Sequence, residues 1–314
     1  MKSFFIIVNP QANHGLGQKT WEKIEPLLQS GNYMYQAVLC NHNIDFLVRS
    51  FLKKTDYQLE QTICLVIGGN GTLHDSLNAL KKHSQRQLPL ALIPAGKNNS
   101  FAKNMGISLN PSTAFKQIIT TQQAINYDIG SYIETTHKTE GYFLSSYNIG
   151  LEAYFASLNA QENLFFNKLH LGLIGYLYNL LKTYMNQESF SVTLRINGQY
   201  EFFKKAYLVS VHTHQPCFDP RTHLQVPLGH ANDGQLEFLV AEKMNIFKFL
   251  FLALMARMNK HVRLPSLKQF TSKRAHLIIN SLEFGEIDGQ EESNRYYDLN
   301  FEIDYYPFWF SSQS

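Results

Sequence analysis

The stretch TICLVIGGNGTLHDSLNAL, residues 62–80, decides the fold that the chain is expected to adopt. Its first part, 62–67, is a short apolar run rich in β-branched side chains, as a buried parallel strand requires. A glycine-rich turn, 68–71, follows at once, and from Thr72 onward apolar residues recur at helical spacing. Thr72 and Asp75 resemble a capping box, which predicts a helix N-terminus at this point. The stretch therefore predicts a strand, a tight turn and a helix.

The turn has the chemistry of a phosphate-binding loop. Its glycines, Gly68, Gly69 and Gly71, let the backbone approach a ligand closely. N–H groups clustered at a helix N-terminus, together with the positive end of the helix dipole, favour an anion, most simply a phosphate. A tight turn that binds nothing is the alternative, because a single glycine-rich turn is a weak signal.

Composition indicates a globular protein with two domains. At 314 residues, the chain is longer than one hydrophobic core usually serves. An apolar share of 44% with 17% charged residues is typical of a folded chain. The net charge is only +3, and no stretch concentrates Lys and Arg, which argues against a nucleic-acid partner.

The cysteines and the apolar segments favour a cytoplasmic protein. Cys40, Cys64 and Cys217 are odd in number and far apart, which fits a reducing compartment and gives no metal-site spacing. The apolar run at 4–8 is too short for a signal peptide, and the longest run, 246–255, is too short to span a bilayer. We therefore expect a cytoplasmic chain, for which contact with the inner face of the membrane stays open.

Up to about residue 120, strands alternate with helices, which predicts a doubly wound parallel sheet. Strands are expected at 2–8, 35–39, 62–67 and 88–93, and helices at 20–28, 45–52, from Thr72, from Ser100 and at 112–120. In such sheets, ligands bind beyond the C-terminal ends of the strands. The loops 9–17, 68–72 and 94–99 are therefore expected to meet at that edge.

After about residue 126 the chain becomes rich in strands, which predicts an all-β second domain. Strands are expected at 124–129, 141–149, 189–196, 204–212, 235–240, 274–280 and 298–305, with helical inserts at 163–185 and 245–259. Asn197-Gly198 and Asp233-Gly234 are typical turn pairs. We expect an antiparallel β-sandwich with helical inserts. The domains would be 1–130 and 131–305, with the tail 306–314 packing back on the first.

Several motifs accompany the glycine-rich turn in a fixed order. They are 8–10 (VNP), 68–72 (GGNGT), 93–102 (IPAGKNNSFA), 127–130 (YDIG), 148–150 (NIG), 233–236 (DGQL) and 285–290 (GEIDGQ). In this order they resemble the diacylglycerol kinase catalytic domain family, whose motifs are VNP, GGDGT, PxGTxNDFA, D-x-G, N-x-G, DGxL and DGE. That family includes bacterial lipid kinases and sphingosine kinases and is related in fold to NAD kinases. The order of the later motifs fits a lipid kinase better than an NAD kinase.

The resemblance implies an N-terminal nucleotide-binding domain, a C-terminal β-sandwich and an active site in the cleft between them. Backbone N–H groups of the two glycine-containing loops would hold the phosphates of ATP, with Mg²⁺ neutralising their charge. The residues implied in nucleotide binding are Asn9, Gly68, Gly69, Asn70, Gly71, Thr72, Gly96, Lys97 and Asn98. Asp288 would be the catalytic base that accepts the proton of a lipid hydroxyl. Asp128 would support Mg²⁺, and Asp233 would belong to a separate structural metal site.

The sequence departs from the family pattern around the metal. We place the GGDGT aspartate at Asn70, the NDFA aspartate at Asn99 and the DGE glutamate at Gln290. Of the three carboxylates in the metal network, only Asp128 remains, so the Mg²⁺ site is weakened. Lys97 replaces the threonine of the phosphate loop and is able to pair directly with a phosphate oxygen. We expect nucleotide binding with less dependence on Mg²⁺, and catalysis that is weakened or lost.

Each of these residues also has a purely structural interpretation. Asp288 and Asp233 both precede a glycine, where an aspartate is often a turn residue. Asp128 would then cap a loop, and Lys97 would be solvated.

We therefore interpret the chain as an ATP-dependent lipid kinase of the diacylglycerol kinase type. The alternative is a non-catalytic protein of the same fold that binds a nucleotide, a phosphate or a lipid. The helical inserts have more apolar side chains than one amphipathic stripe needs, and a basic cluster at 257–263 follows the second. Packing in the core of the sandwich accounts for most of these side chains, and the surplus beside the basic cluster is left for another partner. This predicts contact with a lipid substrate and with an anionic membrane surface. A homodimer stays open.

Overall fold

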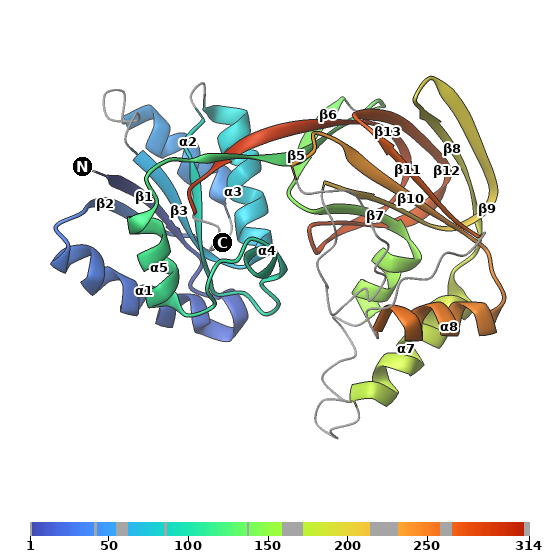
Figure 1. Ribbon diagram of the computed structural model, residues 1–314, viewed down its shortest axis with the longest axis horizontal. Coiled ribbons are helices and arrows are strands. Elements are labelled where there is room, and N and C mark those ends of the chain that lie inside the picture. Colours follow the sequence, from blue (N-terminus) through green and yellow to red (C-terminus); the bar gives the residue numbers. More distant parts are fainter. Residues whose placement is uncertain are drawn as a thin grey trace. The chain divides into compact units, whose positions relative to one another are not determined.

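The computed structural model describes residues 2–40, 43–54, 62–84, 87–136, 138–158, 172–213, 232–257 and 266–310. These residues form a mixed α/β protein (Figure 1), which confirms the mixed class expected from the sequence. The chain divides into two compact units. Unit 1 is Met1–Tyr127 with Tyr305–Ser314, and unit 2 is Asp128–Asp304.

Unit 1 contains a sheet of parallel strands in the order β2-β1-β3-β4. The strands are β1 (Ser3–Val8), β2 (Met34–Leu39), β3 (Thr62–Gly68) and β4 (Leu90–Pro94). The registers Ile6↔Ala37 and Ile6↔Leu65 place β1 between β2 and β3. Every residue of β3 and β4 is buried, which explains why both strands are continuous apolar runs. Because the strands run in the same direction, the loops after β1, β3 and β4 lie at one edge of the sheet (Figure 1).

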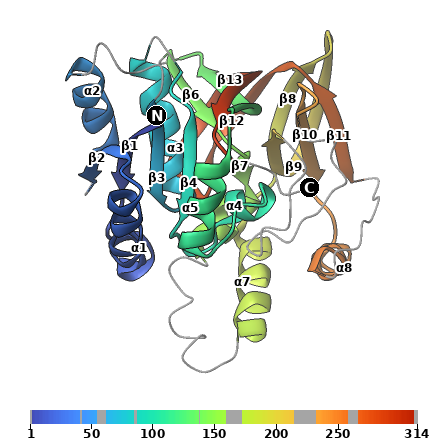
Figure 2. The same ribbon diagram turned by 60° about the vertical axis from the view of Figure 1, so that its left-hand side comes forward.

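The helices of unit 1 pack in two pairs, α1 with α5 and α2 with α3 (Figure 2). The helices described in this unit are α1 (Ala12–Ser30), α2 (Ile44–Lys54), α3 (Asn70–His83), α4 (Ser100–Asn104) and α5 (Pro111–Thr120). The start of α1 lies within 9–17, which the sequence predicted as a loop. Asn13, His14 and Gly15 nevertheless have positive φ and interrupt this first part of the helix. The sequence analysis therefore missed the short first part of α1. These three residues separate it from the regular helix that follows.

Two further helix starts differ from the prediction. α3 begins at Asn70, two residues earlier than expected, with Gly69 as its N-cap, and no side chain caps it. The predicted capping box is wrong because the Thr72 hydroxyl is used elsewhere: Thr72 Oγ1 accepts a hydrogen bond from Asn9 Nδ2 at 3.0 Å. The helix predicted from Ser100 is the short α4, which ends at Asn104.

The last described residues of the chain are part of the core of unit 1. Tyr306 and Phe308 are 0% and 1% exposed. The Trp309 N–H donates to the Leu90 carbonyl at 2.7 Å, next to β4, and Trp309 Nε1 donates to the Ile118 carbonyl of α5 at 2.9 Å. Unit 1 is therefore built from two parts of the chain that are almost 180 residues apart.

Unit 2 is strand-rich, and its strand pairs with a known register are antiparallel. The strands are β5 (Ile125–Glu134), β6 (Thr139–Phe143), β7 (Ser146–Gly150), β8 (Phe190–Ile196), β9 (Gln199–His212), β10 (Leu236–Glu242), β11 (Leu267–Ser272), β12 (Arg274–Ile287) and β13 (Gln290–Phe308). The hydrogen-bonded order is β11-β10-β9-β7-β12-β13, while β8 pairs with β9 and β12, and β5 pairs with β6 and β13. Alternate residues of these strands, such as Leu194 and Ile196 of β8, are buried in a shared core. The other face of β8 is polar, as the period of a half-buried strand requires, whereas β10 is buried on both faces because Leu208 and Ala241 pack in a second hydrophobic cluster.

The strand predictions for unit 2 were too short and missed one strand. The single strand expected at 141–149 is two strands, β6 and β7, separated by Leu144 and Ser145. β11 was missed because its sequence, LKQFTS, is mostly polar. The expected turn at Asn197-Gly198 joins β8 to β9, and both residues have positive φ.

Two helices described in unit 2 fall within the predicted inserts. They are α7 (Gly172–Asn186) and α8 (Ile246–Arg257), and the remainder of the inserts, 163–171 and 258–259, lies outside the described residues. None of the helices in the described ranges combines the length and the hydropathy that a bilayer crossing needs.

Phe308→Ala should destabilise the protein by about 3–5 kcal/mol, because it empties the space of a fully buried aromatic ring. Tyr305→Ala is the matched control on the same strand, since Tyr305 is 55% exposed. It should cost less than about 1 kcal/mol. Urea denaturation measures both, and equal losses would contradict the role of the C-terminal strand in the core of unit 1.

Candidate functional site

The turn between β3 and α3 touches the loop after β4 through two glycines. A Cβ atom on Gly69 would lie 3.1 Å from the Gly96 Cα, and one on Gly96 would lie 2.6 Å from the Gly69 Cα. The Ala95 N–H also donates to the Gly68 carbonyl at 2.8 Å. The two loops are therefore held together backbone against backbone, and a side chain at Gly96 would force them apart.

The loop after β4 is closed by the amide of Asn99. Asn99 Oδ1 accepts from the Gly96 N–H and Asn99 Nδ2 donates to the Gly96 carbonyl, both at 2.8 Å. Asn99 has φ +51°, a conformation that asparagine adopts more readily than most residues. Among the described residues, the side chains of Lys97 and Asn98 have no hydrogen-bond partner, and Lys97 is exposed. The tight loop thus presents a cation and an amide that are available to a ligand.

Asn9 ties the first loop to this arrangement. Its N–H donates to the Ile67 carbonyl at 2.9 Å, and its side chain donates to Thr72 Oγ1 at 3.0 Å. The predicted residues lie at one edge of the unit 1 sheet, at the end of β3, in the first turn of α3 and in the loops after β1 and β4; they are Asn9, Gly68, Gly69, Asn70, Gly71, Thr72, Gly96, Lys97 and Asn98. A helix N-terminus and clustered N–H groups at that edge favour an anion.

Asn70 and Ser100 bridge the two glycine-containing loops. Asn70 Nδ2 donates to Ser100 Oγ at 2.5 Å, while Asn70 Oδ1 is buried with no partner among the described residues. Phe101-Ala102 sets the register of the PxGTxNDFA motif, so its aspartate position is Ser100. Our assignment of that aspartate to Asn99 was wrong, because Asn99 occupies the asparagine position of the motif. At the two positions where the family motifs have carboxylates, this chain has the neutral amide of Asn70, which is hydrogen-bonded to the hydroxyl of Ser100.

At the two motif positions where the family has carboxylates, Asn70 and Ser100, this chain has neutral side chains, whereas a protein usually binds Mg²⁺ through one or two carboxylates. No group of three or more His, Cys, Asp or Glu side chains in the described part of the chain is arranged to hold a metal ion. In unit 1, the orphan Asn70 Oδ1 is an uncharged oxygen at the start of α3, beside the glycine-rich turn. It is able to accept a hydrogen bond from a metal-bound water, but it supplies no negative charge.

Asp128 and Asp233 lie at one turn of unit 2. Asp128 Oδ2 accepts from the Gly234 N–H at 2.8 Å, and the Asp128 N–H donates to Asn232 Oδ1 at 2.7 Å. Burial raises the pKa of Asp128; the Gly234 N–H partly offsets this, and the nearby charge of Asp233 adds to it. Asp233 Oδ1 accepts from the Gln235 N–H at 3.0 Å, so it stabilises its own turn. These contacts join the two aspartates to a loop, and a metal role for either stays a prediction.

Asp288 is a buried turn residue whose carboxylate accepts three backbone hydrogen bonds. It is 6% exposed, has φ +51° and lies between β12 and β13. Its Oδ2 accepts from the Leu144 N–H at 2.7 Å, and its Oδ1 accepts from the N–H groups of Ser145 and Ser146 at 2.7 and 3.2 Å. A carboxylate has about four lone-pair positions, so these bonds leave at most one for a substrate hydroxyl. The contacts fix the turn between β6 and β7, and the catalytic role of Asp288 stays a prediction.

The comparison with protein families matches residues 3–132 to the diacylglycerol kinase catalytic domain. The resemblance drawn from the sequence motifs is thereby confirmed over that part of the chain. A protein of Bacillus subtilis (strain 168) named "Putative lipid kinase YtlR" is 24% identical over 281 residues, which cover 87% of this chain and 88% of that protein. A "Putative lipid kinase" of Staphylococcus epidermidis (strain ATCC 12228 / FDA PCI 1200) is 28% identical over 148 residues. That match covers 47% of this chain and 44% of the relative, so it spans less than half of either protein.

Solved structures share the fold over almost the whole chain. The "Crystal structure of a putative diacylglycerol kinase from Bacillus anthracis str. Sterne" superposes with a TM-score of 0.73 at 22% identity, covering 99% of this chain and 97% of that one. A second structure, "A putative diacylglycerol kinase from Bacillus anthracis str. Sterne", has a TM-score of 0.71 at 20% identity over the same shares. At this identity the likeness describes the fold alone.

Asp288→Asn should destabilise the protein by about 1.5–3 kcal/mol, because an NH₂ group then faces N–H donors that a charged oxygen had satisfied. Asp233→Asn is the matched control: Asp233 also precedes a glycine, but the substitution keeps the oxygen that the Gln235 N–H needs. Its effect should stay within about 0.5 kcal/mol. Thermal unfolding measures both variants. An Asp288→Asn protein as stable as wild type would show that the carboxylate is not needed for the turn.

Proposed function

We propose that this chain, related over residues 3–132 to the diacylglycerol kinase catalytic domain, is an ATP-dependent lipid kinase whose transfer step is weakened. The observation that carries the proposal is the Gly69–Gly96 contact, which joins two phosphate-type loops at the C-terminal edge of a parallel sheet. Ligands of parallel sheets bind at this edge. The phosphates of ATP are the simplest ligand for its backbone donors and for Lys97.

Lys97 would supply part of the positive charge that a metal gives in other kinases. Its ammonium is exposed on a loop that the Asn99 amide holds closed, so the loop itself needs little reordering on binding. Mg²⁺, when bound together with ATP, would neutralise phosphate charge. The chain would then depend less on that ion than a kinase with three carboxylates does.

The Asn70–Ser100 pair is the reason to expect weak transfer. Two neutral groups stand where the related motifs have two carboxylates, so the site holds a metal less tightly and orients it less well. Phosphoryl transfer depends mainly on alignment and charge neutralisation. Loss of metal positioning should therefore reduce the rate of transfer more than the affinity for ATP.

A non-catalytic binding protein is the second candidate, and the carboxylate of Asp288 favours it. The three hydrogen bonds that this carboxylate accepts from backbone N–H groups are typical of a structural residue. If Asp288 is not a base, the DGE motif holds no other acid, because its glutamate position is Gln290. The chain would then bind a nucleotide or a phosphate without transferring it.

The finer architecture belongs to the same proposal. The two helix pairs of unit 1 support a doubly wound sheet, and the antiparallel pairing and alternate burial in unit 2 support a sandwich. The domains would be 1–130 and 131–305, in a cytoplasmic protein. A crystal structure of the ATP complex with Asp288 remote from the γ-phosphate would contradict this arrangement.

A lipid acceptor and an anionic membrane surface are the proposed partners of α7 and α8. These helices pack together: Tyr184 of α7 stacks on Phe249 of α8 with ring centroids 5.0 Å apart. Their outer faces nevertheless expose large apolar side chains. These are Tyr178, Leu181 and Met185 on α7, and Phe247 and Phe251 on α8, between 38% and 79% exposed. Lys248 is exposed beside Phe247, so apolar insertion and attraction to anionic lipid would act together.

Binding of ATP should persist in EDTA, with an affinity within about tenfold of that in Mg²⁺, because the described loops hold phosphate without metal carboxylates. Lys97→Gln should weaken binding about tenfold or more by removing a charge-assisted hydrogen bond. Lys103→Gln, on the exposed side of α4, is the matched control and should bind as wild type does. Isothermal titration calorimetry measures all three. Affinity that vanishes in EDTA, or equal effects of both substitutions, would contradict direct phosphate binding by the loops.

Transfer is tested with labelled ATP, Mg²⁺ and mixed-lipid vesicles. We expect a small amount of labelled lipid from the wild-type chain. The double variant Asn70→Asp, Ser100→Asp should raise it about tenfold or more, because it restores two carboxylates for the metal. Ser191→Asp with Gln199→Asp, which adds two carboxylates at exposed positions of unit 2, serves as the charge control and should leave transfer unchanged. If none of these proteins transfers phosphate while ATP still binds, the result would favour the second candidate, a non-catalytic binding protein, over the kinase.

Membrane contact is tested by sedimentation with vesicles of phosphatidylglycerol or phosphatidylcholine. The chain should sediment with the anionic vesicles, and Phe247→Ser with Phe251→Ser should reduce the bound fraction several-fold, since two exposed rings no longer insert. Tyr296→Ser, at a ring that is 61% exposed on β13, is the control. A bound fraction unaffected by the changes in α8 would exclude this face as the membrane contact.

A further inference from the structure

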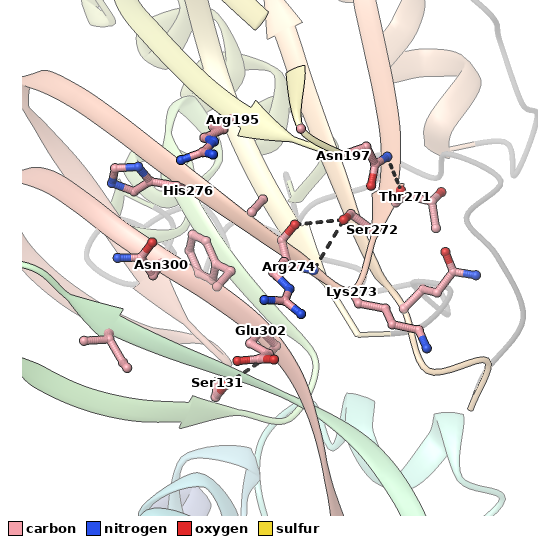
Figure 3. A pocket seen from close by; sticks show the side chains of 15 residues that line it. Ser131, Arg195, Asn197, Thr271, Ser272, Lys273, Arg274, His276, Asn300 and Glu302 are labelled. Atoms are coloured by element: carbon pink, nitrogen blue, oxygen red, sulfur yellow. Dashed lines mark hydrogen bonds between the residues drawn. The ribbon is translucent and has the colours of Figure 1, made fainter. Parts of the chain in front are cut away.

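We propose that unit 2 has a second anion-binding site, a cationic cavity on the polar face of its sheet that takes a phosphate-bearing ligand. The cavity has a volume of about 800 Å³, which is within the range of ligand pockets. Figure 3 shows its side chains, which come from β5, β8, β11, β12 and β13. None of its residues belongs to the phosphate loops of unit 1, so it is a separate site on the chain.

Strand register brings the charged residues of the cavity to one face. Arg195 of β8 lies opposite His276 of β12, and His276 lies opposite Asn300 of β13. Two residues before His276 on β12, Arg274 lies opposite Glu302 of β13. The residues between them point to the other side, where Leu194, Ile196, Ala275, Leu277, Leu299 and Phe301 are buried in the core. The polar row is therefore fixed by the same alternation that builds the core.

The cavity carries an excess of positive charge. Arg195, Lys273 and Arg274 are permanent cations, and Glu302 is the one carboxylate among the lining residues, so two positive charges are in excess. His276 is held by Asp298, with Nε2 and Oδ1 2.6 Å apart. In the described part of the chain, neither the Lys273 ammonium nor the Arg274 guanidinium has a hydrogen-bond or ion-pair partner. Cations gathered in a hollow with too few carboxylates favour an anionic ligand.

Hydrogen bonds brace the backbone at the rim of the cavity, so the strands that carry the charged residues are fixed before a ligand arrives. The bend at Lys273 is anchored because its carbonyl accepts from the Ile303 N–H at 2.9 Å. Asn197 Nδ2 donates to the Thr271 carbonyl at 3.1 Å, which ties the β8–β9 turn to β11. Ser131 Oγ donates to the Glu302 carbonyl at 2.9 Å, which ties β5 to β13. A preorganised site loses less entropy on binding.

The side chains identify the chemistry of the ligand. Two guanidinium groups offer the planar fork of donors that matches a phosphate, and the lysine adds a point charge. Arg195 also lies over the Tyr200 ring, with its Cζ 5.6 Å from the centroid, which orients its guanidinium. Asn300, Thr271 and Ser272 add neutral polar groups of the kind that bind hydroxyls. A phosphate ester with polar substituents fits these groups, either as a soluble compound or as the headgroup of an anionic lipid.

An ordinary solvated sheet face is the competing interpretation. On such a face, charges of opposite sign alternate across strands, as Arg274 and Glu302 do. Arg195 and Lys273 break this pattern, because neither has a carboxylate partner in the described residues and both line the same hollow. The geometry points to a bound anion as the missing partner.

The test uses tripolyphosphate as the soluble probe and hydrogen exchange of the full chain as a site-resolved readout. Tripolyphosphate should slow exchange in peptides covering 193–198 and 270–276 of wild type and of Lys97→Gln. The double variant Arg195→Gln, Arg274→Gln should bind there about tenfold or more weakly, since it removes two charge-assisted contacts. Lys204→Gln with Lys205→Gln, which removes two exposed charges of β9 outside the cavity, is the matched control and should respond as wild type does.

The outcomes separate this site from the proposed nucleotide site. Protection confined to peptides covering 68–72 and 95–99 would support the nucleotide site and overturn the second site. Protection of 193–198 and 270–276 that persists in the arginine variant would overturn it as well. Retention on phosphatidylglycerol vesicles that is lost in the arginine variant would support the site and identify a lipid headgroup. Protection by tripolyphosphate without such retention would support it and identify a soluble phosphate compound.

Discussion

The close approach of two backbones, at Gly69 and Gly96, is the constraint on which the candidate site depends. The loops after β3 and β4 meet there without side chains between them, because a Cβ atom on Gly96 would lie only 2.6 Å from the Gly69 Cα. The Asn99 amide then closes the second loop on Gly96, and Asn9 connects the loop after β1 to Thr72. The parallel sheet supplies the common edge, and the glycines make that edge dense in backbone donors.

Local patterns predicted the parts of the fold that depend on hydrophobic periodicity. The buried strands β3 and β4 and the helix α5 were found because their apolar residues are continuous or regularly spaced. The polar strand β11 and the helical turn at Ala12 were missed, since neither has such a pattern. The capping box failed because its threonine is used by a residue 63 positions away.

The sequence predicted which loops form the candidate site, but not which hydrogen bonds connect them. Glycines and motif order located the turn after β3, but the pairing of Asn70 with Ser100 depends on two loops 30 residues apart. The three N–H partners of Asp288 lie more than 140 residues away in sequence, so the Asp-Gly pair alone could not reveal them. The cationic cavity is formed by several strands at once, and no single stretch of sequence carries its signal.

Unit 1 needs residues of β13 that are synthesised only after unit 2. Phe308 pairs with Leu90, and the Trp309 N–H bonds to the same residue, so the start of β4 lacks these partners until residues 308–309 have been synthesised. An open strand edge is a template for pairing with other chains. Until then, the start of β4 offers backbone groups without these partners, and slow elongation through unit 2 would prolong that exposure.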